Sequence, residues 1–200
     1  CVPSRGGLIS GQYQNKFGLE SNPQFKDAEV MKQFAELETL PERLQKAGYA
    51  TGMAGKWHLG PGNEIADHGF DHVYYRNSGR PATANMGLDG KDVPLGEYPS
   101  KVYHLDACSQ VASAFIERHQ KKPFFFYLAY RAPHVPLDAP QNYLDRFPGE
   151  MPERRRQALA MLSAVDDGVG RIVQTLEKCG LAENPMIWVV GDNGAPLKIH

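Results

Sequence analysis

The chain has 200 residues, of which 42% are hydrophobic and 22% are charged, a composition typical of a globular domain large enough to bury its own core. Its 22 basic and 23 acidic residues give a net charge of −1, so nothing predicts a general attraction to nucleic acid or to an anionic membrane. The apolar runs are far too short to span a bilayer, and three cysteines make neither a disulfide framework nor a CxxC metal site.

Two helices are predicted in the first quarter of the chain. Residues 3–11 are expected to form a short helix, which leaves Cys1 at or beside its N-terminus. Thr39 and Glu42 have the spacing of a capping box and predict a second helix over residues 39–47, ended by a glycine.

The middle of the chain combines regular elements with one irregular stretch. A strand is expected at residues 49–54. Residues 61–104 are rich in Gly, Pro and Asn and are expected to form a long irregular excursion, a kind of segment that is often functional. A helix over residues 106–120 then leads into an almost wholly apolar strand at 123–130, as expected for a strand covered on both faces.

The last part of the chain repeats the helix–strand order. A long helix is predicted over residues 152–179, and a second buried strand at 186–190. Alternation of strands and helices predicts an α/β fold with parallel strands. Ligands of such sheets bind at the carboxyl ends of the strands, which here carry residues 131–134 and 192–193.

Polar groups near three of these elements have the spacing to meet at one anion. Cys1 and Arg5 are four residues apart and share a helix face. The backbone N–H groups at the start of a helix favour an anion, and Arg5 adds to that preference. Lys56 and His58 are two residues apart, so in an extended segment both point to one side and Trp57 to the other. We therefore expect these groups to converge on one oxyanion.

A candidate metal site follows the last predicted strand. Asp192 and Asn193 stand in a turn flanked by glycines, and their side chains offer hard oxygen donors suited to Ca²⁺ or Mg²⁺. Two such donors do not complete a calcium site, which usually takes about 6–8 oxygens. The sequence does not show where the others come from.

Four segments, in this order, resemble the signature segments of the type I, formylglycine-dependent sulfatases of the alkaline phosphatase superfamily. They are CVPSRGGLISG (1–11), YATGMAGKWHLG (49–60), APHVP (132–136) and GDNG (191–194). The resemblance spans nearly the whole chain, and four ordered motifs are far more specific than one. It implies an α/β fold with a mostly parallel central sheet flanked by helices, in which residues 1–200 are part of a single sulfatase catalytic domain.

The resemblance also implies a mechanism of sulfate ester hydrolysis. Cys1 would be converted to formylglycine by a maturation enzyme, and one hydroxyl of the hydrated aldehyde would attack the sulfur of a sulfate ester. Arg5 would hold that diol, and Lys56 and His134 would grip sulfate oxygens. His58 would assist breakdown of the covalent intermediate, and His134 is the candidate to protonate the leaving oxygen.

The same resemblance assigns Cys1, Asp192 and Asn193 to a Ca²⁺ ion, with Mg²⁺ as the alternative. Sulfatases of this kind have a strand before the cysteine that ends in two aspartates, and a further active-site lysine beyond the Asp-Asn pair. Because residues 1–200 contain neither, we expect an interior fragment of a sulfatase, incomplete at both ends and without full activity by itself.

Other functions are compatible with parts of the sequence. The expected substrate is a small-molecule or glycan sulfate ester, preferably a carbohydrate sulfate, with an aryl sulfate as the leading alternative. The family implies export to the periplasm, the cell exterior or the lysosome. One alternative is a phosphate or phosphonate monoester hydrolase of the same superfamily. Another is an amidohydrolase in which Cys1 attacks and its own α-amine serves as the base. A third is an inactive or binding-only fragment.

Overall fold

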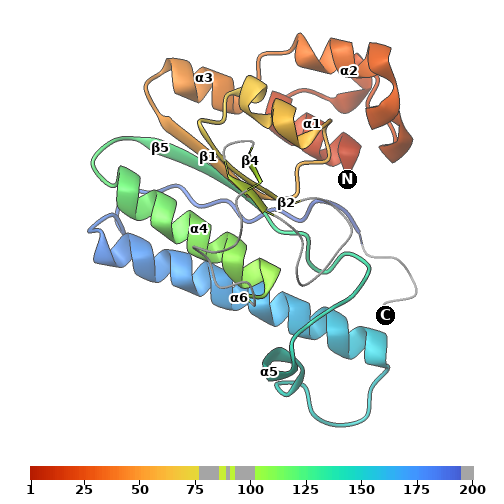
Figure 1. Ribbon diagram of the computed structural model, residues 1–200, viewed down its shortest axis with the longest axis vertical. Coiled ribbons are helices and arrows are strands. Elements are labelled where there is room, and N and C mark those ends of the chain that lie inside the picture. The colour runs from red at the N-terminus through yellow and green to blue at the C-terminus, as the bar shows by residue number, and fades with distance from the viewer. Residues whose placement is uncertain (77–85, 89–90, 93–101, 195–200) are drawn as a thin grey trace.

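The computed structural model describes residues 1–76, 86–88, 91–92 and 102–194, and these form three layers (Figure 1). A sheet lies between two groups of helices, with α4 and α6 on one face and α1, α2 and α3 on the other. The helices are α1 (Val2–Ser10), α2 (Ala28–Ala35), α3 (Leu40–Lys46), α4 (His104–His119), α5 (Gln141–Leu144) and α6 (Glu153–Lys178). Three short 3₁₀ helices are η1 (Gln14–Phe17), η2 (Asn22–Lys26) and η3 (Gly62–His68).

The sheet is parallel at its centre and antiparallel at one edge. Its strands are β1 (Ala50–Gly55), β2 (His72–Arg76), β3 (Met86–Leu88), β4 (Lys91–Asp92) and β5 (Phe124–Ala129), in the spatial order β4-β3-β2-β1-β5. β1 pairs in parallel with both β2 and β5, whereas β2–β3 and β3–β4 are antiparallel. The predicted α/β class with a parallel core is therefore confirmed.

The first two predicted helices are confirmed, together with the residues that begin and end them. α1 begins directly after Cys1 and ends at Gly11, which has the left-handed conformation. α3 begins with the predicted capping box, in which the Thr39 N–H donates to the Glu42 carboxylate at 2.7 Å and the Glu42 N–H donates to the Thr39 hydroxyl at 3.5 Å.

Two predictions about strands were wrong. Residues 186–190 are not a strand: Met186 is 82% exposed and Trp188 75%, because no described strand pairs with this apolar segment. The stretch 61–104 is not irregular throughout, since it contains η3 and the strands β2, β3 and β4, whose pairing with β1 and with one another outweighs the local Gly and Asn content. The rest of that stretch (77–85, 89–90 and 93–101) lies outside the described residues.

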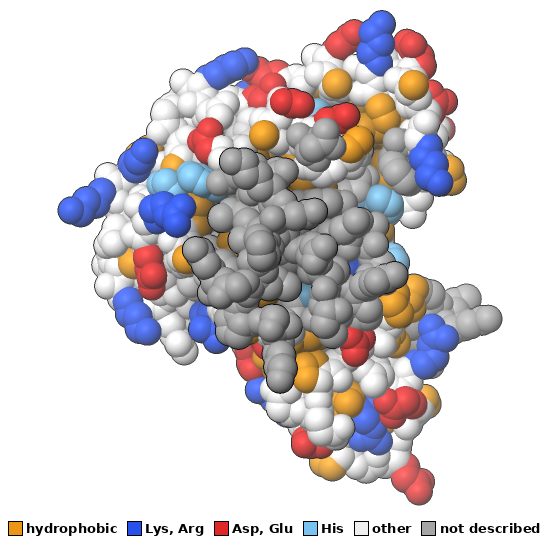
Figure 2. All heavy atoms as spheres, viewed as in Figure 1, with side chains coloured by type: hydrophobic (Ala, Val, Ile, Leu, Met, Phe, Trp, Pro, Cys, Tyr) orange, Lys and Arg blue, Asp and Glu red, His pale blue; other side chains and the backbone are white. Residues whose placement is uncertain are grey.

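Charged side chains of both signs are interspersed over the described surface in the view of Figure 2, as the nearly balanced composition leads one to expect. None of the helices in the described ranges is both long and apolar enough to cross a bilayer.

One glycine decides how closely α6 packs on α4. A Cβ at Gly168 would lie 2.3 Å from both the Ser109 hydroxyl and the Tyr130 hydroxyl, which hydrogen-bond to each other at 2.6 Å. We expect Gly168→Ala to destabilise the protein by about 1–3 kcal/mol through overpacking. Gly170→Ala, two positions along the same helix with nothing within 4 Å of the added Cβ, should instead stabilise it by about 0.5–1 kcal/mol. Chemical denaturation measures the free energy of unfolding of both variants. An equal change in this free energy for the two would contradict the packing argument.

A buried histidine is expected to make the stability of the protein depend on pH. The His68 ring is 7% exposed and packs on Phe34 and Trp57 with centroid distances of 5.1 and 5.4 Å. Burial lowers its pKa, so the folded state favours the neutral ring, and that contribution to stability is lost as the pH falls below the ordinary value of about 6.5. We expect His68→Phe to lose less melting temperature than the wild type between about pH 7 and about pH 5. If the melting temperatures of His68→Phe and of the wild type fall equally between these pH values, His68 is not the group responsible for the pH dependence.

Candidate active site

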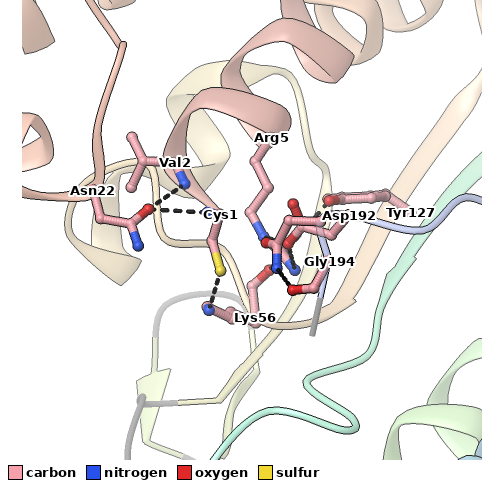
Figure 3. A network of polar contacts seen from close by, with 9 residues as sticks. Cys1, Val2, Arg5, Asn22, Lys56, Tyr127, Asp192 and Gly194 are labelled. Carbon is pink, nitrogen blue, oxygen red and sulfur yellow. Dashed lines mark hydrogen bonds and ion pairs between the residues drawn. The ribbon is translucent and has the colours of Figure 1, made fainter. Parts of the chain in front are cut away.

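Cys1 lies at the N-terminus of α1, in the N-cap position (Figure 3). The helix begins here because Pro3, with its fixed φ, occupies the first turn, and the Arg5 N–H donates to the Cys1 carbonyl at 3.0 Å. The nitrogens of Cys1 and Val2 both donate to Oδ1 of Asn22, at 2.9 and 3.0 Å. The side chain of Cys1 is thereby directed away from Asn22 and toward Lys56.

Arg5 joins three distant segments of the chain. Its side chain is buried, and its Nε and Nη2 atoms both lie 3.0 Å from Oδ2 of Asp192, 187 residues along the sequence. Nη1 donates to the Lys56 carbonyl and, at 3.4 Å, to the Tyr127 hydroxyl. The guanidinium therefore fixes the relative positions of the start of α1, the end of β1 and the Asp-Asn turn.

Lys56 is the first residue after β1 and reaches Cys1. Its N–H donates to the Ala129 carbonyl at 2.8 Å, and its Nζ lies 3.2 Å from Sγ of Cys1. The close approach of the two strands requires Gly55, which has φ 104° and whose Cβ would lie 2.2 Å from the Ala129 oxygen. Burial first, and then the charge of Arg5, lowers the pKa of Lys56 to about 8.

His58 is held in an unusual backbone conformation. Its φ of 64° lies in the left-handed region, which non-glycine residues seldom adopt. Trp57 is fully buried and anchors this turn in the core. Burial, followed by the charges of Lys56 and Arg5, lowers the pKa of His58 to about 4, so the ring is neutral near pH 7.

His134 lies at the exposed rim of the site, in the loop after β5. Its N–H donates to the Arg131 carbonyl at 2.9 Å, and its Nδ1 lies 2.6 Å from the Val135 carbonyl oxygen. Lost hydration lowers its pKa, and the charge of Lys56 lowers it further. Electrostatic coupling thus relates His134 to the centre of the site, whereas Cys1, Arg5 and Lys56 are joined by direct contacts.

The residues expected to bind a metal fit part of a hard cation's ligand set. Oδ1 of Asp192 is shielded from solvent and accepts no hydrogen bond within the described residues, so it remains available to a cation. Asn193 is exposed, and its Nδ2 donates to the Gly194 carbonyl at 3.1 Å. In the described ranges, no group of three or more His, Cys, Asp or Glu side chains is placed to hold a metal ion. Asp192 and Asn193 would therefore supply some of its ligands.

Three residues of the site were not singled out by sequence analysis. Asn22 orients the start of α1 from a 3₁₀ helix, and nothing in the sequence pattern indicates that contact. Tyr127 faces Arg5 from within β5, where it reads as an ordinary core residue. Arg131 follows the carboxyl end of β5 after one intervening residue, and that position is a usable signal for a ligand-binding residue.

The fold places the chain in a known class. The solved structure of Ps i-CgsB in complex with k-i-k-neocarrahexaose matches 92% of this chain with a TM-score of 0.81 and 28% identity, over 46% of its own length. The architecture is thus the alkaline-phosphatase/sulfatase-like α/β fold. The sequence model of the Sulfatase family matches residues 1–199. The chain belongs to the sulfatase family.

Curated relatives extend well beyond the aligned region. Arylsulfatase J of Mus musculus is 30% identical over 97% of this chain, which corresponds to 35% of its own length. N-acetylgalactosamine-6-sulfatase of Homo sapiens is 30% identical over 98% of this chain and 41% of its own length. The chain therefore spans little more than a third of the length of these two relatives.

Proposed function

We propose that the full-length protein hydrolyses a sulfate monoester, with a sulfated carbohydrate as the substrate class. The observation that carries the proposal is the contact of Lys56 Nζ with Sγ of Cys1, 3.2 Å, beside the buried guanidinium of Arg5. A nucleophile surrounded by cations suits an anionic ester. Family membership supports the reaction, and the names of relatives that act on N-acetylgalactosamine 6-sulfate or bind a neocarrahexaose support the substrate class.

Each side chain of the site has a proposed role that follows from its position. Matured to formylglycine, residue 1 would supply a hydrated aldehyde as the nucleophile. Arg5, fixed by Asp192, orients the helix end that carries this group. Lys56 donates to sulfate oxygens beside it, where charge develops in the transition state. We assign to His58, which is neutral near pH 7, the acceptance of a proton from residue 1, and to His134 at the rim, in its protonated form, the donation of a proton to the leaving alcohol.

The proposal includes a Ca²⁺ ion, with Mg²⁺ as the alternative hard cation. Asp192 and Asn193 would hold it, the carboxylate through the Oδ1 atom that is shielded and accepts no hydrogen bond from described residues. The cation would supply positive charge that polarises the sulfate group. Residue 1 would contribute a further ligand once oxidised.

A maturation enzyme that oxidises Cys1 is the implied partner. We also infer export from the cell, to the periplasm, the exterior or the lysosome. Membership of the sulfatase family supports both inferences, and the location of the tagged full-length protein after cell fractionation tests the second.

The metal assignment predicts a stability effect that is independent of turnover. Millimolar Ca²⁺ is expected to raise the melting temperature of the wild-type protein, because a ligand that binds only the folded state stabilises it. Asp192→Asn should lose most of this rise, since it removes the carboxylate. Asp166→Asn, at an exposed position of α6, is the matched control and should keep it. Calorimetry with and without Ca²⁺ checks this, and an equal rise in both variants would contradict the assignment.

The reaction is tested by comparing esters on the matured full-length protein. Hydrolysis of an aryl sulfate and of sulfated hexosamines, with little hydrolysis of the matching aryl phosphate, is the expected result. Preference for the phosphate would support the phosphate or phosphonate hydrolase instead. A free thiol and a free α-amine at residue 1 together with amidase activity would support the N-terminal nucleophile reaction. Absence of turnover despite oxidised Cys1 would support a binding-only protein.

A further inference from the structure

Arg131 is a charged residue of the site's neighbourhood that the proposed reaction does not use. It follows Tyr130 after the end of β5, on the same edge of the sheet as Lys56, whose N–H donates to the last residue of β5, Ala129. The carboxyl ends of parallel strands are where α/β folds bind ligands. Position alone therefore places the backbone of Arg131 beside the site.

The guanidinium of Arg131 lacks a counter-charge in the described part of the chain. Its Nη2 donates to the Val135 carbonyl, while Nη1 is shielded from solvent and meets no acceptor among the described residues. The ion pairs in the described ranges leave Arg131 out. Burial lowers its pKa, as expected for a cation that has lost hydration. A shielded cation without a partner is costly, and an anionic ligand removes that cost.

The charge of Arg131 acts on the residues proposed to hold the sulfate. Its positive charge contributes, after burial, to the lowered pKa of both Lys56 and His134. Arg5, by contrast, is neutralised by Asp192 at 3.0 Å. Among the described residues, Lys56 and Arg131 are thus two cations near the same strand ends that have no ion-pair partner. Lys56 is proposed to bind the transferred sulfate group, which leaves Arg131 for a second anionic group.

A surface pocket lies beside the loop whose Val135 carbonyl accepts a hydrogen bond from Arg131. Val135, Pro136 and Leu137 line a pocket of about 390 Å³ together with Glu153, Arg154 and Gln157 of α6. Three apolar and three polar or charged residues thus line it, and sites that bind organic ligands combine both kinds of side chain. The hydrogen bond from Arg131 to the Val135 carbonyl places the guanidinium next to one of the residues that line this pocket.

We propose that Arg131 binds a second anionic group of the substrate, a sulfate or carboxylate on the same or the adjoining sugar, and thereby selects polyanionic glycans. This inference rests on the proposed function and names its substrate subclass. The planar guanidinium suits a bidentate contact with a sulfate or carboxylate. Nη1 and the other N–H groups of Arg131 that do not donate to the Val135 carbonyl would make this contact.

The test compares Arg131→Gln and Arg131→Lys with the wild-type full-length protein on two probes, glucosamine 6-O-sulfate and glucosamine 2-N,6-O-disulfate. We expect Arg131→Gln to lower kcat/KM for the disulfate about 10- to 100-fold, mainly through KM, and to leave the monosulfate within about threefold. Arg131→Lys should recover part of the loss because it keeps the charge. Arg155→Gln, at an exposed position of α6, is the control and should change neither.

Two kinds of result would overturn the inference. Equal losses on both probes would show that Arg131 serves the scissile sulfate or only the loop, and no loss on either would remove it from the site. If the wild type hydrolyses neither probe, the proposed reaction fails on them, and calorimetric titration with the same two compounds decides the role of Arg131. Tighter binding of the disulfate that disappears in Arg131→Gln supports it; no such preference in the wild type overturns it.

Discussion

Replacing Cys1 by alanine is expected to lower sulfate ester turnover by roughly 10³-fold or more, because residue 1 would carry the nucleophile and covalent catalysis has no substitute at that position. The fold should survive, since the backbone contacts of Cys1 with Asn22 and Arg5 do not involve the side chain. Steady-state kinetics and melting temperature on the full-length variant measure the two effects separately.

The control for that variant is Cys179→Ala, which removes a partly exposed thiol just after α6. It should match the wild type in turnover. Mass spectrometry of the peptide that contains residue 1 adds a direct readout, because an aldehyde and a thiol differ in mass. Substantial turnover by Cys1→Ala, or an unmodified thiol in a fully active preparation, would contradict the formylglycine assignment.

Lys56→Met is expected to lower kcat/KM about 10²–10³-fold, since it removes a preorganised donor aimed at the position of the nucleophile. The loss should appear mainly in kcat if Lys56 acts on charge that develops in the transition state. Stability should not fall, because the lysine is buried against the neighbouring positive charge of Arg5, and methionine fills a similar volume.

Lys122→Met tests whether the loss of any lysine has the same effect. Lys122 is exposed at the turn between α4 and β5, and its substitution should leave both kinetic constants unchanged. A Lys56→Met enzyme with wild-type kcat/KM would exclude Lys56 from the reaction, and equal losses in both variants would indicate a general effect of charge.

Elements fixed by local chemistry were predictable from the sequence. The capping box of Thr39 and Glu42 and the Pro and Gly at the two ends of α1 define helix boundaries without help from the rest of the fold. Residues 186–190 show the opposite case, because an apolar run becomes a strand only when another strand pairs with it. β2 was missed for the same reason, since its pairing with β1 is invisible in local composition.

The part of the candidate site that depends on residue spacing within one helix or at one strand end was predictable from the sequence. The positions of Cys1, Arg5 and Lys56 follow from one helix face and one strand end, and the structure brings these three into contact. The ion pair between Arg5 and Asp192 spans 187 residues, a separation at which only the folded topology brings two side chains together. Asn22 likewise acts through a tertiary contact that carries no sequence signature.

The left-handed backbone of His58 opposes stability to the catalytic role proposed for the same residue. A glycine would relax this conformation and is expected to make the protein harder to unfold, while removing the imidazole from the site. If His58 has the proposed role in proton transfer, selection for thermal resistance alone would favour variants at position 58 that are robust and catalytically poor. An engineering campaign on this protein should screen for turnover from its first round and keep His58 fixed when consensus or heat-challenge methods are used.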